Sequence, residues 1–521
     1  MNIVEVFAET AHRRSSHTAL IDKERRFSFE ELLAEVDRQA GRLRSAGFEA
    51  GVPTLVLMKN SAEFVALVFA LFRVGAVPIL VDPGMGLGRF LKVIEEVEPE
   101  GLVGIPRAFA LKKMSPKAFR TVRFEACWGH FPEVCDLRRG TSPDRISTAK
   151  AGPNDTAAIL FTSGSTGPAK GVVYTHSIFT KQVDVLRDVY RFRLDDVDLP
   201  GFPLFGLFTA AMGVTGVIPD LDPSRPAQCS PFDLLTQIHR YGVTSLQGSP
   251  AIWKRVAAEC TARKITLPLI RRLITFGAPI SFEFLETWRR IAPNARISTP
   301  YGATEALPLT DIDAEEILTT KAARNHNAAG MCVGKPLPLN KLRIVDYHRR
   351  PESLQPLAVG EVGEVAVTGP VVTKSYYRKS KATAKSKIPT EEGVWHLMGD
   401  LGYLDDQGRL WLVGRKSHLI RFGEREMYPL PGEGMVLPHP DVERAALVEG
   451  KTGPVLVIER RRGSLTTEPV LRRECLSLIR QTEEYSVVKD VVFHPGMPVD
   501  PRHNAKIHRE ELSAWVKKLG R

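Results

Sequence analysis

Short apolar runs alternate with amphipathic segments along the N-terminal half of the chain, and this alternation constrains the fold more than any other feature. Residues 54–58 (TLVLM) and 77–83 (VPILVDP) have the length and composition of buried strands, and residues 62–75 between them have those of a helix. The same order recurs where helix-like residues 233–242 and 284–293 precede further strand-like runs. Strand–helix–strand alternation predicts a parallel sheet flanked by helices.

The most apolar run, residues 64–81, lacks the continuity of a membrane segment. Arg73 and Pro78 interrupt it, so we expect a buried helix followed by a strand and no membrane span. Residues 1–16 contain acidic side chains and no apolar core of the kind found in a signal peptide. Six scattered cysteines without a C-x-x-C pair predict neither a zinc site nor a disulfide framework, so a reducing, cytoplasmic location is expected.

The sequence changes character twice towards the C-terminus. From about Arg343 short apolar runs are broken by Gly and Asp, which predicts β-rich structure. After Arg415 strand-like and helix-like runs alternate at residues 442–450, 454–459, 471–481 and 489–495. The expected fold class is α/β, with a large N-terminal domain (1–414) of helix-flanked sheets that includes a β-rich subdomain. A small, mobile α+β domain (415–521) follows it.

The chain carries a formal net charge of +11 over 521 residues. This excess favours an anionic substrate such as a nucleotide, an acidic partner or a membrane surface. No basic–aromatic array or helix-turn-helix pattern accompanies it, so we expect no nucleic-acid partner. Residues 372–387 contain six basic side chains and no acidic one. They predict a solvated surface segment, with an electrostatic docking patch as the alternative.

The segment FTSGSTGPAKG at residues 161–171 combines three glycines, four hydroxyl side chains and Lys170. Glycine lets backbone amides converge, and convergent amides, hydroxyls and an ammonium group suit a polyphosphate. Strand-like residues 157–161 and 171–175 enclose the segment, which favours a phosphate-binding loop between two strands over a solvated turn. It is not a Walker A loop, because G-x-x-x-x-G-K-[ST] is absent.

Several further motifs follow this segment in a fixed order: YGATE (301–305), GEVGEVAVTG (360–369), MGDLGYLDDQGRLWLVGRK (398–416) and NAKIHREEL (504–512). Together they resemble the ordered core motifs of the acyl-adenylate-forming enzymes, which include acyl-CoA synthetases, nonribosomal adenylation domains and luciferases. The resemblance runs from about residue 15 to the C-terminus. It implies activation of a carboxylic acid with ATP and Mg²⁺ to give an acyl-AMP and pyrophosphate. Because an anionic carboxylate approaches an anionic phosphate, positive charge and a metal are needed.

The resemblance assigns a role to each matching residue. It implies that the phosphate-binding residues are Thr162, Ser163, Gly164, Ser165, Thr166, Gly167 and Lys170. Tyr301 and Gly302 line the nucleotide, Thr304 touches the α-phosphate, and Glu305 is the Mg²⁺ ligand. Outside this motif, a glutamate after Gly-x-Thr is interpreted as a helix N-cap.

The resemblance also implies how the nucleoside and the reacting groups are held. Adenine lies beside Gly277, Ala278 and Pro279. Asp400 accepts hydrogen bonds from both ribose hydroxyls, and Arg415 also reaches the ribose. Lys506 neutralises the carboxylate and the α-phosphate, so that Lys506, Glu305 and Thr304 form the catalytic set. Without the motifs, Asp400 is interpreted as a turn residue and Lys506 as solvated surface.

Four positions depart from the common motifs. Ala505 precedes Lys506 where glycine is common, Ser417 occupies a hinge position that commonly holds Asp or Lys, Met398 replaces a common Thr, and Gly206 stands where many acyl-CoA synthetases carry His. With the segments VDPGMGL (81–87), EREMYPLP (424–431) and residues 202–227, 395–411 and 500–512, they look like the olefin β-lactone synthetases.

That resemblance implies adenylation of a long-chain 2-alkyl-3-hydroxy fatty acid, whose own 3-hydroxyl then attacks the activated carbonyl. The products are a β-lactone, AMP and pyrophosphate, and effective molarity replaces an external thiol. Residues 202–214, rich in Phe, Leu and Met, suit an alkyl pocket, with ordinary core as the alternative. The implied pathway partners are thiolase-like, reductase and β-lactone decarboxylase enzymes.

Two other functions remain open from the sequence. One is a fatty acyl-CoA or acyl-carrier ligase. The other, of a different class, is a nucleotide-binding assembly subunit without catalysis. The presence of Lys170, Glu305, Asp400 and Lys506 argues against the subunit, because it has no chemical need for all four.

Overall fold

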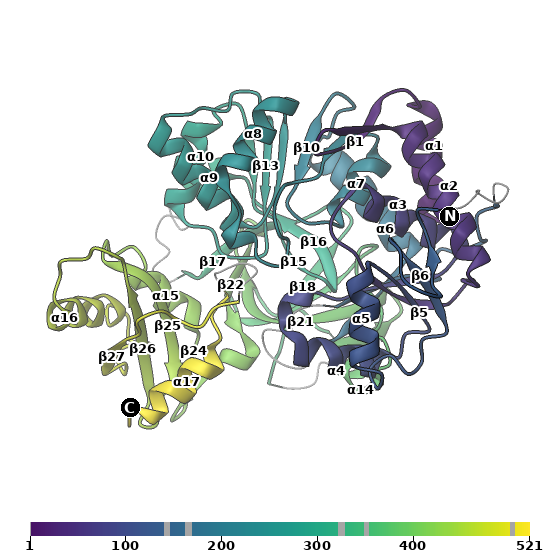
Figure 1. The fold of residues 1–521 in the computed structure, drawn as a ribbon. Helices are drawn as coiled ribbons and strands as arrows, with labels where there is room; N and C mark the ends of the chain where they lie inside the picture. Colours follow the sequence, from purple (N-terminus) through teal and green to yellow (C-terminus); the bar gives the residue numbers. More distant parts are fainter. Residues whose placement is uncertain (1, 140–145, 162–168, 321–328, 349–353, 501–505) are drawn as a thin grey trace.

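The computed structural model describes residues 2–139, 146–161, 169–320, 329–348, 354–500 and 506–521. Figure 1 shows a large part that contains the N-terminus and a smaller part, coloured yellow-green to yellow, that contains the C-terminus. The large part consists of two helix-flanked sheets and a β-rich sheet. This arrangement confirms the predicted α/β fold class.

The first sheet is almost entirely parallel and has the strand order β14-β13-β12-β10-β11-β1-β2, with only the pair β1–β2 antiparallel. Its strands are β1 (Thr18–Asp22), β2 (Arg25–Ser28), β10 (Val197–Pro200), β11 (Thr215–Val217), β12 (Ser245–Gly248), β13 (Arg272–Thr275) and β14 (Arg296–Ser298). The helices α8 (Pro231–Tyr241), α9 (Pro250–Arg263) and α10 (Phe282–Ile291) share an apolar core with this sheet.

The second sheet has the order β7-β6-β5-β3-β4-β8-β9, with only the pair β8–β9 antiparallel. Its strands are β3 (Pro53–Leu57), β4 (Val77–Leu80), β5 (Gly101–Gly104), β6 (Phe124–Cys127), β7 (Cys135–Asp136), β8 (Thr156–Phe161) and β9 (Gly171–Thr175). One core joins it to α4 (Leu87–Val97) and α5 (Pro106–Met114). A second core contains α1 (Ile3–Arg13), α2 (Phe29–Ser45), α3 (Ala62–Val74), α6 (His176–Val189) and α7 (Phe205–Met212).

Helix α3 explains the most apolar run of the sequence. All its residues except Glu63 are buried, so the helix is apolar on every side because it lies inside the protein. Ser61 caps its first turn by accepting a hydrogen bond from the Phe64 amide, and Gly75 ends it with a positive φ. The expected buried helix followed by a strand is confirmed. Within the described ranges, no helix has both the length and the apolarity needed to span a membrane.

The third sheet is antiparallel and has the order β15-β16-β17-β22-β21-β19-β18, with β20 paired to β21. Its strands are β15 (Tyr301–Ala303), β16 (Ala306–Asp311), β17 (Met331–Pro336), β18 (Lys341–Val345), β19 (Gly363–Thr368), β20 (Lys387–Thr390), β21 (Gly393–Leu404) and β22 (Leu410–Arg415). The β-rich part therefore begins at Tyr301, earlier than Arg343. The prediction placed the start too late because helix α11 (Ala314–Thr319) separates β16 from β17 and interrupts the succession of strand-like runs.

In its described residues the small part contains a hairpin, a three-stranded sheet and three α-helices. Its elements are β23 (Ile420–Phe422), β24 (Arg425–Met427), α15 (Pro429–Val436), β25 (Val442–Glu449), β26 (Pro454–Arg460), α16 (Glu468–Ile479), β27 (Asp490–Phe493) and α17 (Arg509–Lys518). It has apolar cores of its own. Ser417 lies exposed in the short turn Lys416–His418 between β22 and β23. The boundary after residue 414 stays a prediction.

The basic segment 372–387 is not the uniformly solvated stretch that its composition suggested. Helix α14 (Ser380–Ser386) has no buried residue, but Thr373, Tyr376 and Lys387 are buried. The prediction of a solvated segment is wrong for these residues. They form buried hydrogen bonds, including those that Lys387 Nζ donates to the carbonyl and hydroxyl oxygens of Thr373.

Candidate functional site

The predicted nucleotide residues follow the carboxyl ends of neighbouring parallel strands. Gly277, Ala278 and Pro279 follow β13 after one intervening residue, and Tyr301 comes after β14, the neighbour of β13 in the sheet. Gly277 has a φ of +93°, a conformation that favours glycine. Ligands in open α/β sheets bind at this edge, so the sheet topology brings the expected adenine segment and the YGATE segment together.

Asp400 forms a compact polar cluster with Tyr301 and Arg415. It lies opposite Arg415 on the antiparallel strands β21 and β22. The Tyr301 hydroxyl donates to Asp400 Oδ2 at 2.6 Å, and Arg415 Nε lies 3.0 Å from Oδ1. Asp400 is buried within a strand, so its interpretation as a turn residue is wrong.

Charge couples this cluster to Glu305. The pKa of Arg415 is raised above its ordinary value, mainly by the Asp400 carboxylate, with additional effects from Tyr301 and Glu305. Burial, together with Asp400, raises the pKa of Tyr301 well above its ordinary value, so its phenol remains a hydrogen-bond donor at neutral pH. The Arg415 guanidinium is therefore a permanent cation that interacts with both carboxylates.

Thr304 and Glu305 occupy the turn between β15 and β16, so the alternative of a helix N-cap is wrong. Side chains and backbone of two other segments donate hydrogen bonds to the backbone carbonyls of this turn. The Tyr174 hydroxyl donates to the Thr304 carbonyl at 2.6 Å, and both the amide and the hydroxyl of Thr373 donate to the Glu305 carbonyl at 2.9 Å. A Cβ on Gly302 would lie 2.6 Å from the Ala306 carbonyl oxygen, which requires glycine at this position.

A phenol contacts the Glu305 side chain, and two lysines lie beside the ring of that phenol. Tyr376 donates to Glu305 Oε1 at 2.8 Å. The Lys170 and Lys387 ammonium nitrogens lie 5.0 and 5.7 Å from the centroid of the Tyr376 ring. Burial lowers the pKa of Lys387 to about 7, while Glu305 opposes that shift. Burial and the charges of Lys387 and Lys170 hold the pKa of His396 well below its usual value, so that histidine is neutral.

Sequence reasoning missed four members of this site: Tyr174, Thr373, Tyr376 and Lys387. Three of them belong to the basic segment 372–387, whose composition concealed them. A tyrosine pair between basic residues carries no signal that one ring will bind a carboxylate. Their role follows only from the way that segment folds against the YGATE turn.

Some predicted residues are placed only in part. Thr162, Ser163, Gly164, Ser165, Thr166 and Gly167 lie outside the described residues. The strands on either side form the predicted antiparallel pair, with Phe161 opposite Gly171, and Lys170 lies beside the Glu305 cluster. Lys506 is on the small part; its side chain is exposed, and its backbone exchanges two hydrogen bonds with Asp500.

An aromatic cavity of about 30 Å³ adjoins the YGATE turn. Phe205 and Phe208 of α7 line it together with Phe276 after β13, and the ring centroids of Phe205 and Phe276 are 5.1 Å apart. Leu307, two residues after Glu305, lines the cavity from the other side. Gln182 and Gln247 also line it and are almost completely buried. Residues 202–214 therefore contribute to a cavity as well as to the core.

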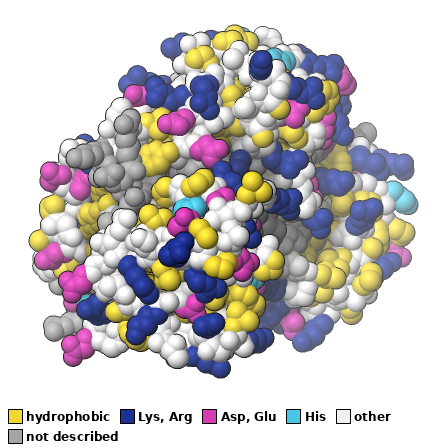
Figure 2. Space-filling model, turned by 90° about the vertical axis from the view of Figure 1, so that its left-hand side faces the viewer, with side chains coloured by type: hydrophobic (Ala, Val, Ile, Leu, Met, Phe, Trp, Pro, Cys, Tyr) yellow, Lys and Arg dark blue, Asp and Glu magenta, His cyan; other side chains and the backbone are white. Residues whose placement is uncertain are grey.

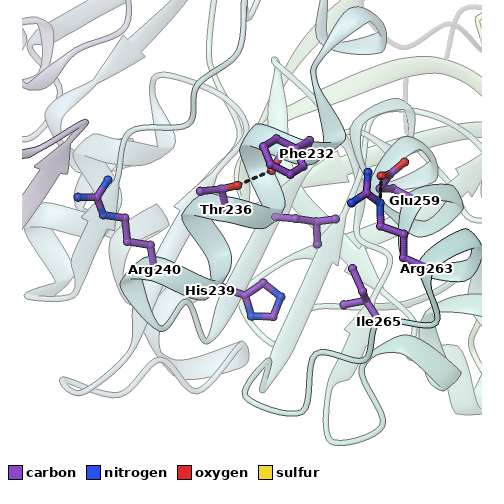
Figure 3. Close-up of a pocket in the computed structure, with 8 residues that line it drawn as sticks. Phe232, Thr236, His239, Arg240, Glu259, Arg263 and Ile265 are labelled. Carbon is purple, nitrogen blue, oxygen red and sulfur yellow. Dashed lines mark hydrogen bonds and ion pairs between the residues drawn. The ribbon is translucent and has the colours of Figure 1, made fainter.

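Two surface features lie elsewhere. A larger groove of about 510 Å³ is bordered by α8 and α9, where Figure 3 shows Phe232, His239 and Arg263 around it. The described residues that line it include none of the predicted site residues. On the face shown in Figure 2, Lys and Arg side chains are interspersed with acidic and apolar ones.

The chain is similar to known adenylate-forming proteins over nearly its whole length. The family described as AMP-binding enzyme matches residues 7–377. The olefin beta-lactone synthetase of Stenotrophomonas maltophilia is 39% identical over 523 residues, covering 97% of this chain and 94% of the relative. ATP-bound MatB from Rhodopseudomonas palustris has a TM-score of 0.82 at 24% identity, covering 100% of both chains.

A further solved structure is O-succinylbenzoate coenzyme A synthetase (MenE) from Bacillus subtilis, in complex with ATP and magnesium ion. It has a TM-score of 0.78 at 23% identity and covers 97% of this chain and 98% of the other. These structures share the fold with a large N-terminal and a small C-terminal part. The chain belongs to the AMP-binding enzyme family and is an ATP-dependent adenylate-forming ligase.

Proposed function

We propose that this ligase activates a long-chain 2-alkyl-3-hydroxy fatty acid as its acyl-AMP and closes it to a β-lactone. The observation that carries the proposal is the 39% identity, along almost the entire chain, to a protein named olefin beta-lactone synthetase. The apolar side chains Phe205, Phe208 and Phe276 support it, because they lie near the YGATE turn and offer an acyl substrate an apolar surface there.

The residues around the turn suit Mg²⁺-ATP. Mg²⁺ prefers carboxylate oxygen, and the carboxylate of Glu305 is held by a neutral donor, the Tyr376 hydroxyl, instead of a direct ion pair. The proposed magnesium ligand is Glu305. Bound Mg²⁺ supplies charge neutralisation at the phosphates. Lys170 adds positive charge to the same region, with Thr162, Ser163, Gly164, Ser165, Thr166 and Gly167 as the proposed phosphate-binding loop.

The nucleoside would be held at the strand ends. Gly277, Ala278 and Pro279 border adenine, Tyr301 and Gly302 line the nucleotide, and Asp400 with Arg415 binds the ribose. In the structure each Asp400 oxygen already accepts one donor, from Tyr301 and from Arg415. A carboxylate oxygen accepts more than one hydrogen bond, so both ribose hydroxyls can be added without breaking this cluster.

The second step needs no external nucleophile. The 3-hydroxyl oxygen attacks the acyl carbonyl carbon, the bond from that carbon to the AMP oxygen breaks, and the hydroxyl proton is released to solvent. The overall products are the lactone, AMP and pyrophosphate. Because the nucleophile belongs to the substrate, its effective concentration at the carbonyl is high.

We also propose the pathway partners and the cellular compartment of this enzyme. The partners would be thiolase-like, reductase and β-lactone decarboxylase enzymes of an olefin pathway. A reducing, cytoplasmic compartment suits the six cysteines, all of which are free.

Product analysis tests the proposal directly. The protein is incubated with ATP, Mg²⁺ and a 2-alkyl-3-hydroxy fatty acid, with and without coenzyme A, and the products are identified by mass spectrometry and NMR. We expect a β-lactone in equal amounts under both conditions. A matched acid without the 3-hydroxyl should stop as bound acyl-AMP, since water is not oriented for attack.

The alternative, an acyl-CoA ligase, gives the opposite pattern. It converts the deoxy acid and unsubstituted fatty acids rapidly to thioesters once coenzyme A is present. Rapid thioester formation without any lactone would disprove lactone synthesis and leave the adenylation step.

A further inference from the structure

The aromatic cavity contains two buried amide oxygens that lack hydrogen-bond partners. Gln247 is 1% exposed and Gln182 is 3% exposed, and both side chains line the cavity. Neither Oε1 atom has a partner among the described residues. A buried acceptor without a donor is unfavourable, so two of them in one cavity favour the binding of a group that can donate.

The orientation of Gln247 is set by a carboxylate behind it. Its Nε2 donates to Asp198 Oδ2 at 2.7 Å, and the Thr209 hydroxyl donates to the same oxygen at 2.9 Å. Burial raises the pKa of Asp198 to about 6, so the group is still ionised at neutral pH. An ionised carboxylate can only accept, so the amide must turn its NH₂ towards Asp198 and leave its carbonyl oxygen on the other side.

Gln182 is oriented by a backbone carbonyl. Its Nε2 donates to the Leu307 carbonyl oxygen at 2.8 Å, which again leaves Oε1 unpartnered. Leu307 lies two residues after Glu305 in the same hairpin, so this acceptor is next to the turn where the acyl carboxylate is activated. Tyr190 also lines the cavity, and its hydroxyl has no hydrogen-bond partner among the described residues either. Because a phenol can donate as well as accept, this hydroxyl does not by itself require a donating ligand, and we assign it no part in binding.

The size of the cavity agrees with a small polar group. A volume of about 30 Å³ accommodates one hydroxyl-sized group and not an alkyl chain. Aromatic rings of Phe205, Phe208 and Phe276 form the rest of the wall, and they cannot replace a missing donor.

We propose that Gln247 and Gln182 bind the substrate's 3-hydroxyl, and that they thereby select a hydroxy acid over its deoxy counterpart at the adenylation step. This inference rests on the proposed function and adds the residues that determine its specificity. An amide oxygen is too weak a base to take the hydroxyl proton at neutral pH. The glutamines are therefore specificity and positioning residues that hold the hydroxyl near the carbonyl.

The experiment compares two acids of the same chain lengths, one with and one without the 3-hydroxyl. Pyrophosphate release gives kcat/KM for acyl-AMP formation with each acid, for the wild type, Gln247→Leu and Gln182→Leu. The wild type should prefer the hydroxy acid about tenfold or more, and each leucine variant should lose most of that preference. Loss of the bonds to Asp198 and to the Leu307 carbonyl affects both acids, so the ratio of the two kcat/KM values is the quantity that should fall.

Gln237→Leu is the matched control. Gln237 is buried and loses two hydrogen bonds on substitution, to the Asp220 amide and the Ile218 carbonyl, but it does not line the cavity. Its hydroxy-to-deoxy ratio should equal that of the wild type, whatever happens to its thermal stability. This control separates a loss of selectivity from a general loss of packing.

The inference is overturned if the wild type adenylates both acids equally, a result that needs no variant to fold. It is also overturned if the glutamine variants lose activity equally on both acids, which indicates that the acceptors only bind structural water. Lactone is measured in the same wild-type reactions. Its absence contradicts the proposed function, while the ratio of kcat/KM values still decides the role of the glutamines.

Discussion

The two carboxylates of the candidate site are each oriented by a hydrogen bond from a neighbouring side chain. Asp400 is held by Tyr301 and Arg415, and Glu305 is held by Tyr376. In each case a phenol donates to a carboxylate, which fixes its position and leaves its negative charge available. A carboxylate that is oriented in advance loses less conformational entropy when it binds a ligand.

We predict that Asp400→Ala raises the KM for ATP more than it lowers kcat. The ribose hydroxyls are bound equally in the ground state and the transition state, so their loss is a loss of uniform binding. A hydrogen bond to a charged group contributes about 1.5–3 kcal/mol, which corresponds to an increase of about tenfold or more in KM. Steady-state kinetics with varied ATP measures it.

Tyr301→Phe provides the comparison, because it removes one donor to Asp400 and keeps the carboxylate. Its effect on the KM for ATP should be clearly smaller. An unchanged KM for ATP in Asp400→Ala would show that Asp400 does not bind the ribose.

At the scale of elements, a buried ion pair joins the last helix to the rest of the small part. Arg509, the first residue of α17, forms a two-pronged pair with Glu433 of α15, with Nη2 and Oε2 2.8 Å apart. Glu433 is buried and also accepts a hydrogen bond from the Leu447 amide of β25 at 2.7 Å. The Glu433 carboxylate therefore joins α15, β25 and α17, and its partner Arg509 lies three residues after Lys506.

We expect Arg509→Ala to lower the free energy of unfolding of the small part by about 3–5 kcal/mol, because Glu433 is then left buried without its cation. Denaturant unfolding measures the change. Lys517→Ala is the control on the same helix, since its pair with Glu449 is largely exposed and contributes less than about 1 kcal/mol. Equal losses in the two variants would contradict a special role of the buried pair.

At the scale of the whole molecule, the proposed catalytic residues are divided between two parts. Thr304 and Glu305 lie in the large part, whereas Lys506 lies in the small part, which Figure 1 shows as a separate lobe. Adenylation as proposed needs Lys506 beside the α-phosphate, so it requires the small part to adopt an orientation that brings this lysine to the YGATE turn. Ser417 and its neighbours between β22 and β23 are where the chain passes from one part to the other.

We predict that Lys506→Ala lowers kcat for acyl-AMP formation by about 2–4 kcal/mol of transition-state stabilisation, with an unchanged melting temperature. The exposed position of Lys506 explains why the fold should tolerate the change. Single-turnover pyrophosphate release measures the rate. Lys518→Ala, an exposed lysine at the end of α17, should behave as the wild type. Wild-type rates in Lys506→Ala would disprove its catalytic role.

The sequence by itself determined what depends on local pattern. Apolar periodicity was enough for part of the two parallel sheets, including β3, β4, α8, α10 and the buried helix α3, because burial imposes these patterns directly. Other elements of these sheets, such as β1, β5, β10, α5 and α9, were not predicted. The ordered motifs were enough for the family. The strand pair around the glycine-rich segment was equally evident, since short apolar runs enclose it.

Only the tertiary structure decided which distant residues meet. Tyr376 and Lys387 were predicted to be solvated, yet the segment that carries them folds against the YGATE turn and places a phenol on Glu305. The two cavity glutamines, Gln182 and Gln247, lie far apart in the sequence and belong to no recognisable motif. Their proposed function requires that each amide nitrogen is hydrogen-bonded while the amide oxygen stays without a partner. Asp198 and the Leu307 carbonyl accept these hydrogen bonds from the amide nitrogens. The residues that make such contacts lie far apart in the sequence, so no local propensity encodes the contacts.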